Sequence, residues 1–333
     1  MIDLTLFSTC PQSRDLQPRP YRERVAEIAR WSEDAGYEGI LVYTDNGLVD
    51  PWLVAQLVIE ATDRLCPLVA VQPAYMHPYA VAKLVASLAH LHGRRIYLNM
   101  VAGGFRNDLL ALGDETDHDD RYDRAVEYAL IVRRLLAGER VTFSGRFYTL
   151  RNVALTPPVP PELAPGVFVS GSSDAGMRAA EALGATAVKY PKPPSDERGV
   201  RANGIPLGMR VGVVAREDAD AAWQVARDRF PEDRQGQVTH ALAMKVSDSR
   251  WHDQLSRLGS TPVSRINPYW LGPFENYRTF CPYLVGSYDG VAAELARYLE
   301  IGFRTFILDI PASEEELTHT AVAFERAASY AGT

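Results

Sequence analysis

Short apolar runs alternate with amphipathic stretches along this sequence, and no other feature constrains its fold as strongly. Most of the apolar runs are nearly continuous in hydrophobicity, as parallel strands covered by helices are. The stretches between them have the apolar spacing of helices that bury one face. The predicted strands are 2–9, 39–44, 68–72, 96–101, 167–170, 186–190, 209–215 and 305–310, and the predicted helices are 21–35, 52–61, 78–91, 122–137, 174–183, 218–230, 288–301 and 313–330.

This alternation predicts an α/β fold, a TIM (β/α)8 barrel. A doubly wound open sheet is the main alternative, but its dinucleotide-binding version is disfavoured because no Gly-x-Gly-x-x-Gly follows the first strand. The 333 residues exceed the roughly 250 that are typical of such a barrel. We therefore expect a single domain over 1–333, with insertions at about 103–121, 141–158 and 231–287. The last insertion is rich in aromatic residues and is expected to form a lid, because loops of this length are usually functional or disordered.

Composition narrows the class of protein. The chain has 35 Lys and Arg against 42 Asp and Glu, a formal charge of −7, which argues against nucleic acid as the main partner. No run approaches the roughly 18 apolar residues of a membrane-spanning helix, and the N-terminus lacks the pattern of a signal peptide. Three scattered cysteines are too few for a disulfide framework or a Cys-rich zinc site. These features predict a soluble cytoplasmic enzyme without a bound metal.

Chemistry in such a barrel lies at the carboxyl ends of the strands. The end of the fifth predicted strand reads Ser-Gly-Ser-Ser-Asp at 170–174 and leads into a helix. Small hydroxyl residues at a strand-to-helix junction expose backbone N–H groups that can bind a phosphate. The plainer interpretation is that Ser173 or Asp174 only caps the helix. The motif alone leaves both interpretations open.

Two further motifs allow more than one role. A buried strand ends in Asn99 and paired glycines, so that Asn99 either satisfies neighbouring backbone groups or hydrogen-bonds a planar heterocycle at the barrel mouth. The acidic motif at 117–122 contains His118. We do not expect it to bind a metal, because no second His lies at ligand spacing.

Five motifs of this sequence occur in the same order as in one known family, and the spacing between them is compatible with that family. They are Asn-Met-Val-Ala-Gly-Gly at 99–104, Asp-His-Asp-Asp-Arg-Tyr at 117–122, Arg-Arg-Leu-Leu-Ala-Gly-Glu at 133–139, Phe-Ser-Gly-Arg-Phe-Tyr at 143–148 and Gly-Ser-Ser-Asp at 171–174. On these motifs the chain resembles the bacterial luciferase-like flavin-dependent monooxygenases, and most closely their alkanesulfonate monooxygenase branch. The family fold is a TIM barrel with insertions, the fold that the alternation also predicts.

The resemblance implies a cofactor and a partner. Reduced FMN (FMNH2) would be a diffusible co-substrate that a separate NAD(P)H-dependent flavin reductase delivers. Its reaction with O2 would give a flavin C4a-(hydro)peroxide, which then oxygenates an organic small molecule. We expect the oxygenase to be a homo-oligomer, a dimer or a tetramer.

The resemblance also implies cofactor-binding residues, carried over by position. Gly171, Ser172 and Ser173 would hold the FMN phosphate. Tyr122 would reach the phosphate from across the barrel mouth. Asn99 and Ala102 would line the flavin ring, with Ala102 standing where the family commonly has Thr. Asp45, at the end of the second strand, would lie close by.

Departures from the family pattern concern the substrate. Alkanesulfonate enzymes carry a His where this chain has Cys10, a Cys where Leu48 aligns and a His where Gly212 aligns. Their absence favours a larger, less charged organic substrate, such as a biosynthetic intermediate, over a sulfonate. The candidate catalytic residues are Cys10, His118, Arg278 and Tyr283, and a buried, inert thiol is the alternative role of Cys10.

Alternative functions remain on this fold. One is an alkanesulfonate monooxygenase, and another is a deazaflavin-dependent oxidoreductase that transfers hydride without oxygen. A non-catalytic flavin-binding protein and a metal-dependent barrel hydrolase are further alternatives, since a fold alone does not fix a function.

Overall fold

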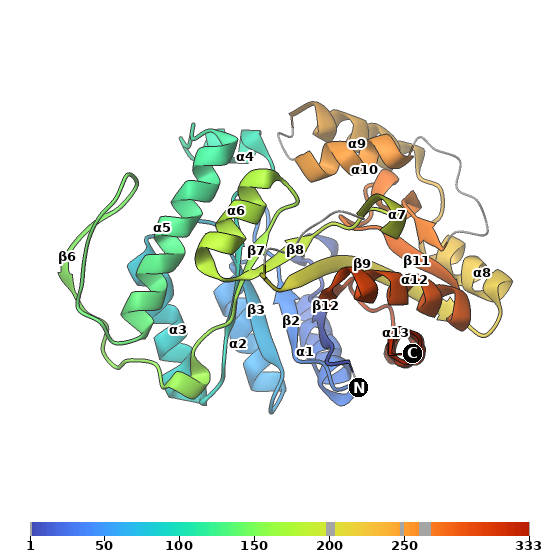
Figure 1. Cartoon of the computed structure of the whole chain (residues 1–333), viewed down its shortest axis with the longest axis horizontal. Helices are drawn as coiled ribbons and strands as arrows, with labels where there is room; N and C mark the ends of the chain where they lie inside the picture. Colours follow the sequence, from blue (N-terminus) through green and yellow to red (C-terminus); the bar gives the residue numbers. More distant parts are fainter. Residues whose placement is uncertain (1, 198–203, 247–249, 260–267, 333) are drawn as a thin grey trace.

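Eight parallel strands close into a barrel in the computed structural model, which describes residues 2–197, 204–246, 250–259 and 268–332 (Figure 1). Around the barrel the order is β9-β12-β1-β2-β3-β4-β7-β8, and pairing of β8 with β9 closes it. The strands are β1 (Thr5–Thr9), β2 (Gly39–Val42), β3 (Cys66–Val71), β4 (Tyr97–Val101), β7 (Val167–Ser170), β8 (Thr186–Lys189), β9 (Leu207–Arg216) and β12 (Phe303–Leu308). The predicted TIM-barrel fold is confirmed, and each of these strands overlaps a predicted one.

Helices follow the strands and cover the outside of the barrel (Figure 1). They are α1 (Pro18–Asp34), α2 (Pro51–Ala61), α3 (Pro78–His92), α5 (His118–Leu136), α6 (Asp174–Leu183), α8 (Ala219–Arg229), α12 (Tyr288–Ile301) and α13 (Glu314–Ala331). The largest difference from the predicted bounds is in α5, which begins at His118 and not at Tyr122. No helix in the described ranges has both the length and the apolar character that crossing a bilayer requires.

The interior of the barrel holds a layer of buried apolar side chains. Phe7 packs edge-on against Phe168 and Tyr97, at centroid distances of 5.4 and 5.3 Å. Gly39 makes room for this layer, because a Cβ at that position would lie 2.8 Å from the Phe7 ring and 2.2 Å from a backbone oxygen. The other members of the layer are Leu41, Leu68, Val188 and Ile307. The barrel is therefore a packed core whose upper end can serve as the floor of a site.

The two shorter predicted insertions, 103–121 and 141–158, each contain short regular elements. The first carries α4 (Arg106–Ala111), and the second forms the predicted hairpin from β5 (Val141–Ser144) and β6 (Thr149–Val153). The hairpin lies at the edge of the molecule beside α5 (Figure 1). The Glu127 carboxylate of α5 holds its turn by accepting the backbone N–H groups of Arg146, Phe147 and Tyr148.

The segment 231–287 contains more regular structure than the sequence indicated. It comprises α9 (Arg234–Val246), α10 (Arg250–Gly259), β10 (Tyr269–Trp270), α11 (Gly272–Glu275) and β11 (Tyr283–Ser287). In Figure 1, α9 and α10 lie at the same end of the molecule as α4. β11, which we did not predict, pairs in parallel with the C-terminal half of β9, from Gly212 to Arg216. The N-terminal half of β9 pairs with β8 and β12 in the barrel. This long strand therefore connects the segment 231–287 to the barrel wall.

Candidate active site

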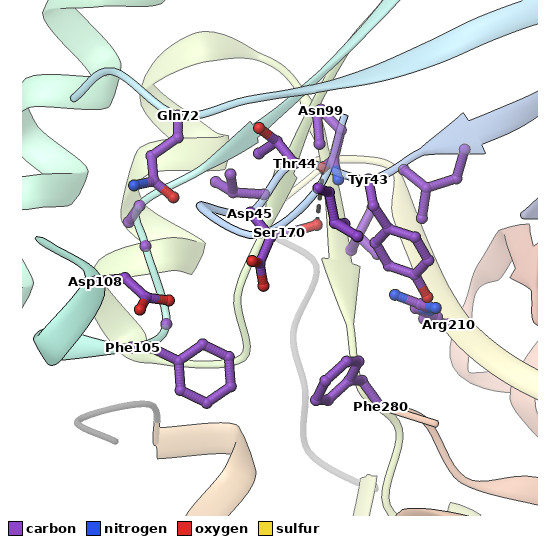
Figure 2. Close-up of a pocket in the computed structure, with 18 of the residues that line it drawn as sticks. Tyr43, Thr44, Asp45, Gln72, Asn99, Phe105, Asp108, Ser170, Arg210 and Phe280 are labelled. Carbon is purple, nitrogen blue, oxygen red and sulfur yellow. Dashed lines mark hydrogen bonds between the residues drawn. The ribbon is translucent and has the colours of Figure 1, made fainter. Parts of the chain in front are cut away.

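A pocket opens at the carboxyl ends of the barrel strands, where the fold places chemistry (Figure 2). Its floor is apolar and is formed by Leu41, Val188 and Ile307, which belong to the layer inside the barrel. Its walls carry polar side chains from several strand ends. The structure brings five predicted site residues to this lining, namely Asp45, Asn99, Ala102, His118 and Tyr122.

Asn99 is held by a side chain from the neighbouring strand. The Ser170 hydroxyl donates to Asn99 Oδ1 over 2.8 Å, as the dashed line in Figure 2 shows. Asn99 is only 4% exposed, and this bond fixes its amide on the pocket wall. Both interpretations of Asn99 therefore apply in part, because one side of the amide is satisfied inside the protein while the residue still lines the pocket.

Tyr122 and Gly171 meet at the edge of the pocket. Tyr122 reaches across from α5, and its hydroxyl donates to the backbone oxygen of Ser170 over 3.3 Å. A Cβ at Gly171 would lie 2.1 Å from the Tyr122 oxygen, and the φ of +155° there also disfavours other residues. The glycine of the motif is thus required by the close approach of the tyrosine.

The two serines of the motif form different hydrogen bonds. Ser173 is the N-cap of α6, and its hydroxyl oxygen accepts the N–H of Gly176 over 3.2 Å. The hydroxyl oxygen of Ser172 accepts the N–H of Tyr190 over 3.1 Å. The cap interpretation of Ser173 is confirmed. Binding of a phosphate by Ser172 and Ser173 stays a prediction, as does the role of Gly171.

Charged side chains gather at one side of the pocket. Arg14 pairs with Asp45 over 3.1 Å, and Asp45 also accepts the N–H of Gly47. Burial, together with the nearby Asp45 carboxylate, raises the pKa of Asp108 above its usual value. His118 lines the pocket from the first turn of α5, with Nδ1 2.7 Å from Asp119 Oδ1.

Two phenylalanines that we did not single out for the site also line the pocket. Phe105 precedes α4 and Phe280 lies between α11 and β11. Their rings lie edge to face, with 6.4 Å between the ring centroids and 63° between the ring planes (Figure 2). The two segments that contribute them are those predicted as insertions at 103–121 and 231–287.

Three candidate catalytic residues do not line this pocket. Cys10 is 1% exposed among apolar side chains, and burial raises the pKa of its thiol, which disfavours a thiolate nucleophile. Arg278 is directed to Asp233, with 2.7 Å between Nη2 and Oδ2. Tyr283 is fully buried in β11 and donates its hydroxyl to Asp309.

Arg210 is a pocket residue that sequence reasoning missed. It lies on β9, is 3% exposed, and lines the pocket with its guanidinium carbon 4.5 Å from the centroid of the Tyr43 ring. The available signal was an arginine inside an otherwise apolar predicted strand, 209–215. A charged residue in such a run is almost never buried without a partner.

Known proteins match the chain in both sequence and structure. The family model for luciferase-like monooxygenases matches residues 3–305. The 4-(γ-L-glutamylamino)butanoyl-[BtrI acyl-carrier protein] monooxygenase BtrO of Niallia circulans is 33% identical over 309 residues, a match that covers 90% of each chain.

Two solved structures share the fold at low sequence identity. The EDTA monooxygenase EmoA from Chelativorans sp. BNC1 has a TM-score of 0.75 at 16% identity, over 99% of this chain and 93% of its own. The oxygenating constituent of 3,6-diketocamphane monooxygenase from Pseudomonas putida is a type II Baeyer-Villiger monooxygenase in complex with FMN. Its TM-score is 0.70 at 14% identity, over 98% of this chain and 97% of its own.

Proposed function

Because this chain belongs to the family of luciferase-like monooxygenases, we propose that it is the oxygenase component of a two-component system. In this proposal a separate NAD(P)H-dependent reductase supplies reduced FMN, and the oxygenase uses it with O2 to oxygenate an organic small molecule. The observation that carries the proposal is the pocket at the barrel mouth, whose wall combines fixed polar groups with an apolar floor. The proposal further includes a cytoplasmic location, a homo-oligomer and a single domain with insertions.

The residues at the pocket fit a flavin phosphate and ring. Beyond the capped N–H of Gly176, the first N–H groups of α6 have no partner within the helix, and a helix N-terminus favours an anion. Ser172, Ser173 and Gly171 adjoin these groups and would hold the phosphate, with Tyr122 beside them. Asn99 and Ala102 line the pocket and would face the ring. Reduced FMN, when bound, supplies the oxygen-activating chemistry.

The chain itself contributes orientation and exclusion of water. Asn99, held by Ser170, presents a fixed amide to whatever lies on the wall. The rings of Phe105 and Phe280, which contact each other edge to face, add apolar surface to the lining of the pocket. Excluding water is what an oxygenase requires to prevent loss of a reactive species by side reactions.

The proposed substrate is a biosynthetic intermediate and not a short alkanesulfonate. Leu48 contributes an apolar side chain to the lining. Gly212 is not among the residues that line this pocket, and a Cβ there would lie 2.2 Å from the Tyr283 ring, so that the Tyr283 ring fills the space of a side chain at this position. BtrO is named for an acyl substrate carried by an acyl carrier protein, which supports a biosynthetic substrate here as well.

Reoxidation of flavin in the presence of O2 tests the proposal. Protein preloaded anaerobically with reduced FMN is mixed with oxygenated buffer, and flavin absorbance and released H2O2 are followed. We expect slower reoxidation and slower H2O2 release than for free reduced FMN, because the pocket shields the bound flavin. Reoxidation identical to that of free flavin would count against the proposal. Preferential binding of a reduced deazaflavin without any reaction with O2 would favour the hydride-transfer alternative.

A further inference from the structure

A second cavity adjoins the pocket on the side of β2 and β3, and the proposed function assigns nothing to it. We call it the side chamber. It is lined by residues of 44–52 and 70–76 and by Leu112, and it shares Asp45, Gln72 and Tyr75, among others, with the lining of the pocket. Of the predicted cofactor-binding residues, all of which the structure describes, Asp45 alone lines it. The side chamber is therefore available to a part of the substrate.

Gln72 stands where the pocket and the side chamber meet, since it lines both. It directly follows β3 and is 7% exposed. Figure 2 shows its amide directed into the pocket, on the same side as Asp108. Within the described part of the chain, this amide forms no hydrogen bond. A buried amide without a partner is costly, and a ligand at this junction would supply the partner.

The charge at this junction is negative. Burial and then the Asp45 carboxylate raise the pKa of Asp108, so the two carboxylates lie close together. Arg14 is paired with Asp45, whereas the Asp108 carboxylate forms no hydrogen bond or ion pair with any residue that the structure describes. The described lining of the side chamber adds Asp50 and contains no Lys, Arg or His. Arg210 lies on the opposite side of the pocket (Figure 2), so a cation at the junction would be attracted by Asp108.

Hydrogen bonds hold the groups at the junction in one arrangement. The Asn46 amide donates to the backbone oxygen of Asp108 over 3.0 Å, and Asn46 Oδ1 accepts the Tyr75 hydroxyl over 2.6 Å. The backbone N–H of Tyr75 donates in turn to the backbone oxygen of Gln72 over 3.0 Å. This chain of bonds connects Gln72 to Asp108, so that an amide oxygen and a carboxylate are fixed on one side of the pocket.

We propose that this junction binds a protonated amino group of the substrate, which donates hydrogen bonds to the Gln72 amide oxygen and to the Asp108 carboxylate. An ammonium group has three donors and no acceptor, and its hydrogen bonds to a carboxylate are among the strong ones. The apolar side chains of the side chamber, which include Trp52, Met76 and Leu112, would cover the attached carbon chain. The inference deepens the proposed function, on which it rests, by naming an organic amine as the substrate class.

Two ligands with the same carbon chain and different charge test the inference. Pentan-1-amine, which is protonated at pH 7, and neutral pentan-1-ol are titrated calorimetrically into the full chain under anaerobic conditions, with and without reduced FMN. Hydrogen bonds from a charged group predict that the amine binds about tenfold more tightly or better. Equal affinities, or binding of neither ligand, would overturn the inference. Since neither ligand needs to react, the result is independent of whether the protein oxygenates anything.

Variants locate the preference at Asp108. Asp108→Asn keeps the shape of the side chain and removes its charge, and we expect the preference for pentan-1-amine to fall to within about twofold. The matched control is Asp220→Asn, because Asp220 stands in the first turn of α8 as Asp108 does in that of α4, but lines neither the pocket nor the side chamber. The control should keep the preference. A preference retained in D108N, or lost equally in D220N, would refute the assignment.

Two variants of Gln72 with opposite expected effects complete the test. Gln72→Glu adds a carboxylate at the junction and should raise the affinity for pentan-1-amine severalfold, whereas Gln72→Leu removes the acceptor oxygen and should lower it severalfold. The affinity for pentan-1-ol should change less in both, and melting curves check that each variant is folded. Equal effects on the two ligands would contradict recognition of the charge. Loss of amine binding in the presence of reduced FMN would also overturn the inference, because the flavin would then occupy the junction.

Discussion

Ser173 caps a helix and is also a proposed ligand of the FMN phosphate, so its two roles need to be separated by experiment. Its hydroxyl caps α6, and the neighbouring Ser172 accepts the N–H of Tyr190, a residue that lines the pocket. If both hydroxyls hold the FMN phosphate, the double variant S172A/S173A should bind FMN more weakly by roughly 2–4 kcal/mol, or about 30- to 1000-fold. Riboflavin, which lacks the phosphate, should bind the variant almost as it binds the native protein. Titration of both flavins, with melting curves alongside, measures this difference.

The chain offers a matched control for the lost cap. Ser287 is the N-cap of α12, and its hydroxyl oxygen accepts the N–H of Gly290 over 3.1 Å, in the same arrangement as in α6. Ser287→Ala should therefore cost about 0.5–2 kcal/mol of stability and leave the affinity for FMN unchanged. If S172A/S173A lost stability but kept its FMN affinity, the serines would be capping residues only.

Leu48 and Gly212 lead to a prediction about substrate specificity. With an apolar side chain on the pocket wall and Tyr283 packed against Gly212, short alkanesulfonates should be poor substrates. An assay of sulfite release with reduced FMN, O2 and a short alkanesulfonate measures this directly. Efficient release of sulfite would show that these two positions do not determine the choice of substrate.

Sequence reasoning found the pocket residues whose motifs are contiguous. Asn99, Ala102, His118 and Tyr122 stand in such motifs, and all line the pocket. It failed where a role depends on which distant segments meet. In the sequence, Arg210 is a single charged residue within an apolar predicted strand. Its ion pair with Asp309 forms only because β9 lies beside β12 in the barrel.

At the scale of elements, Glu33 links the end of α1 to the connection before β3. Its carboxylate accepts the backbone N–H groups of Asp63, Arg64 and Leu65. Burial opposes ionisation of Glu33, but these three N–H groups outweigh it and lower the pKa below its usual value. A lowered pKa in the folded state contributes stability above the unfolded-state pKa of about 4.3, and that contribution is lost as the pH falls further.

Glu33→Gln tests this link through its pH dependence. At pH 7 the variant should be less stable by on the order of 1 kcal/mol, allowing for solvent screening of a partly exposed carboxylate. Below about pH 4 the difference should shrink, because the native carboxyl group becomes protonated. Urea unfolding at the two pH values measures both, with Glu60→Gln on α2 as a control, because the Glu60 carboxylate accepts the side-chain amide of Gln56 and Gln keeps an acceptor oxygen for it. A difference that grew at low pH would contradict the assignment.

Elements with long, regular patterns were predicted well, and short ones were not. The run from Tyr283 to Ser287 has only five residues and follows Pro282 within an aperiodic stretch. It becomes a strand because the C-terminal half of β9 has a free edge with which it pairs. That edge is a property of the assembled barrel, which no local pattern contains.

For the whole molecule, the barrel explains why one end carries the site. The strands are parallel, so that all of their carboxyl ends lie together above an apolar layer. Eight apolar runs were enough to predict this architecture. The residues that cover the mouth come from irregular segments, and their positions depend on tertiary contacts such as those of Phe105 with Phe280.

The affinity for the two redox states of FMN tests the central claim most directly. An oxygenase that takes reduced flavin from a separate reductase should bind reduced FMN more tightly than oxidised FMN. Anaerobic titration of the full chain with each form measures the two dissociation constants. We expect the constant for reduced FMN to be the smaller. Equal binding, or tighter binding of oxidised FMN, would contradict a two-component monooxygenase.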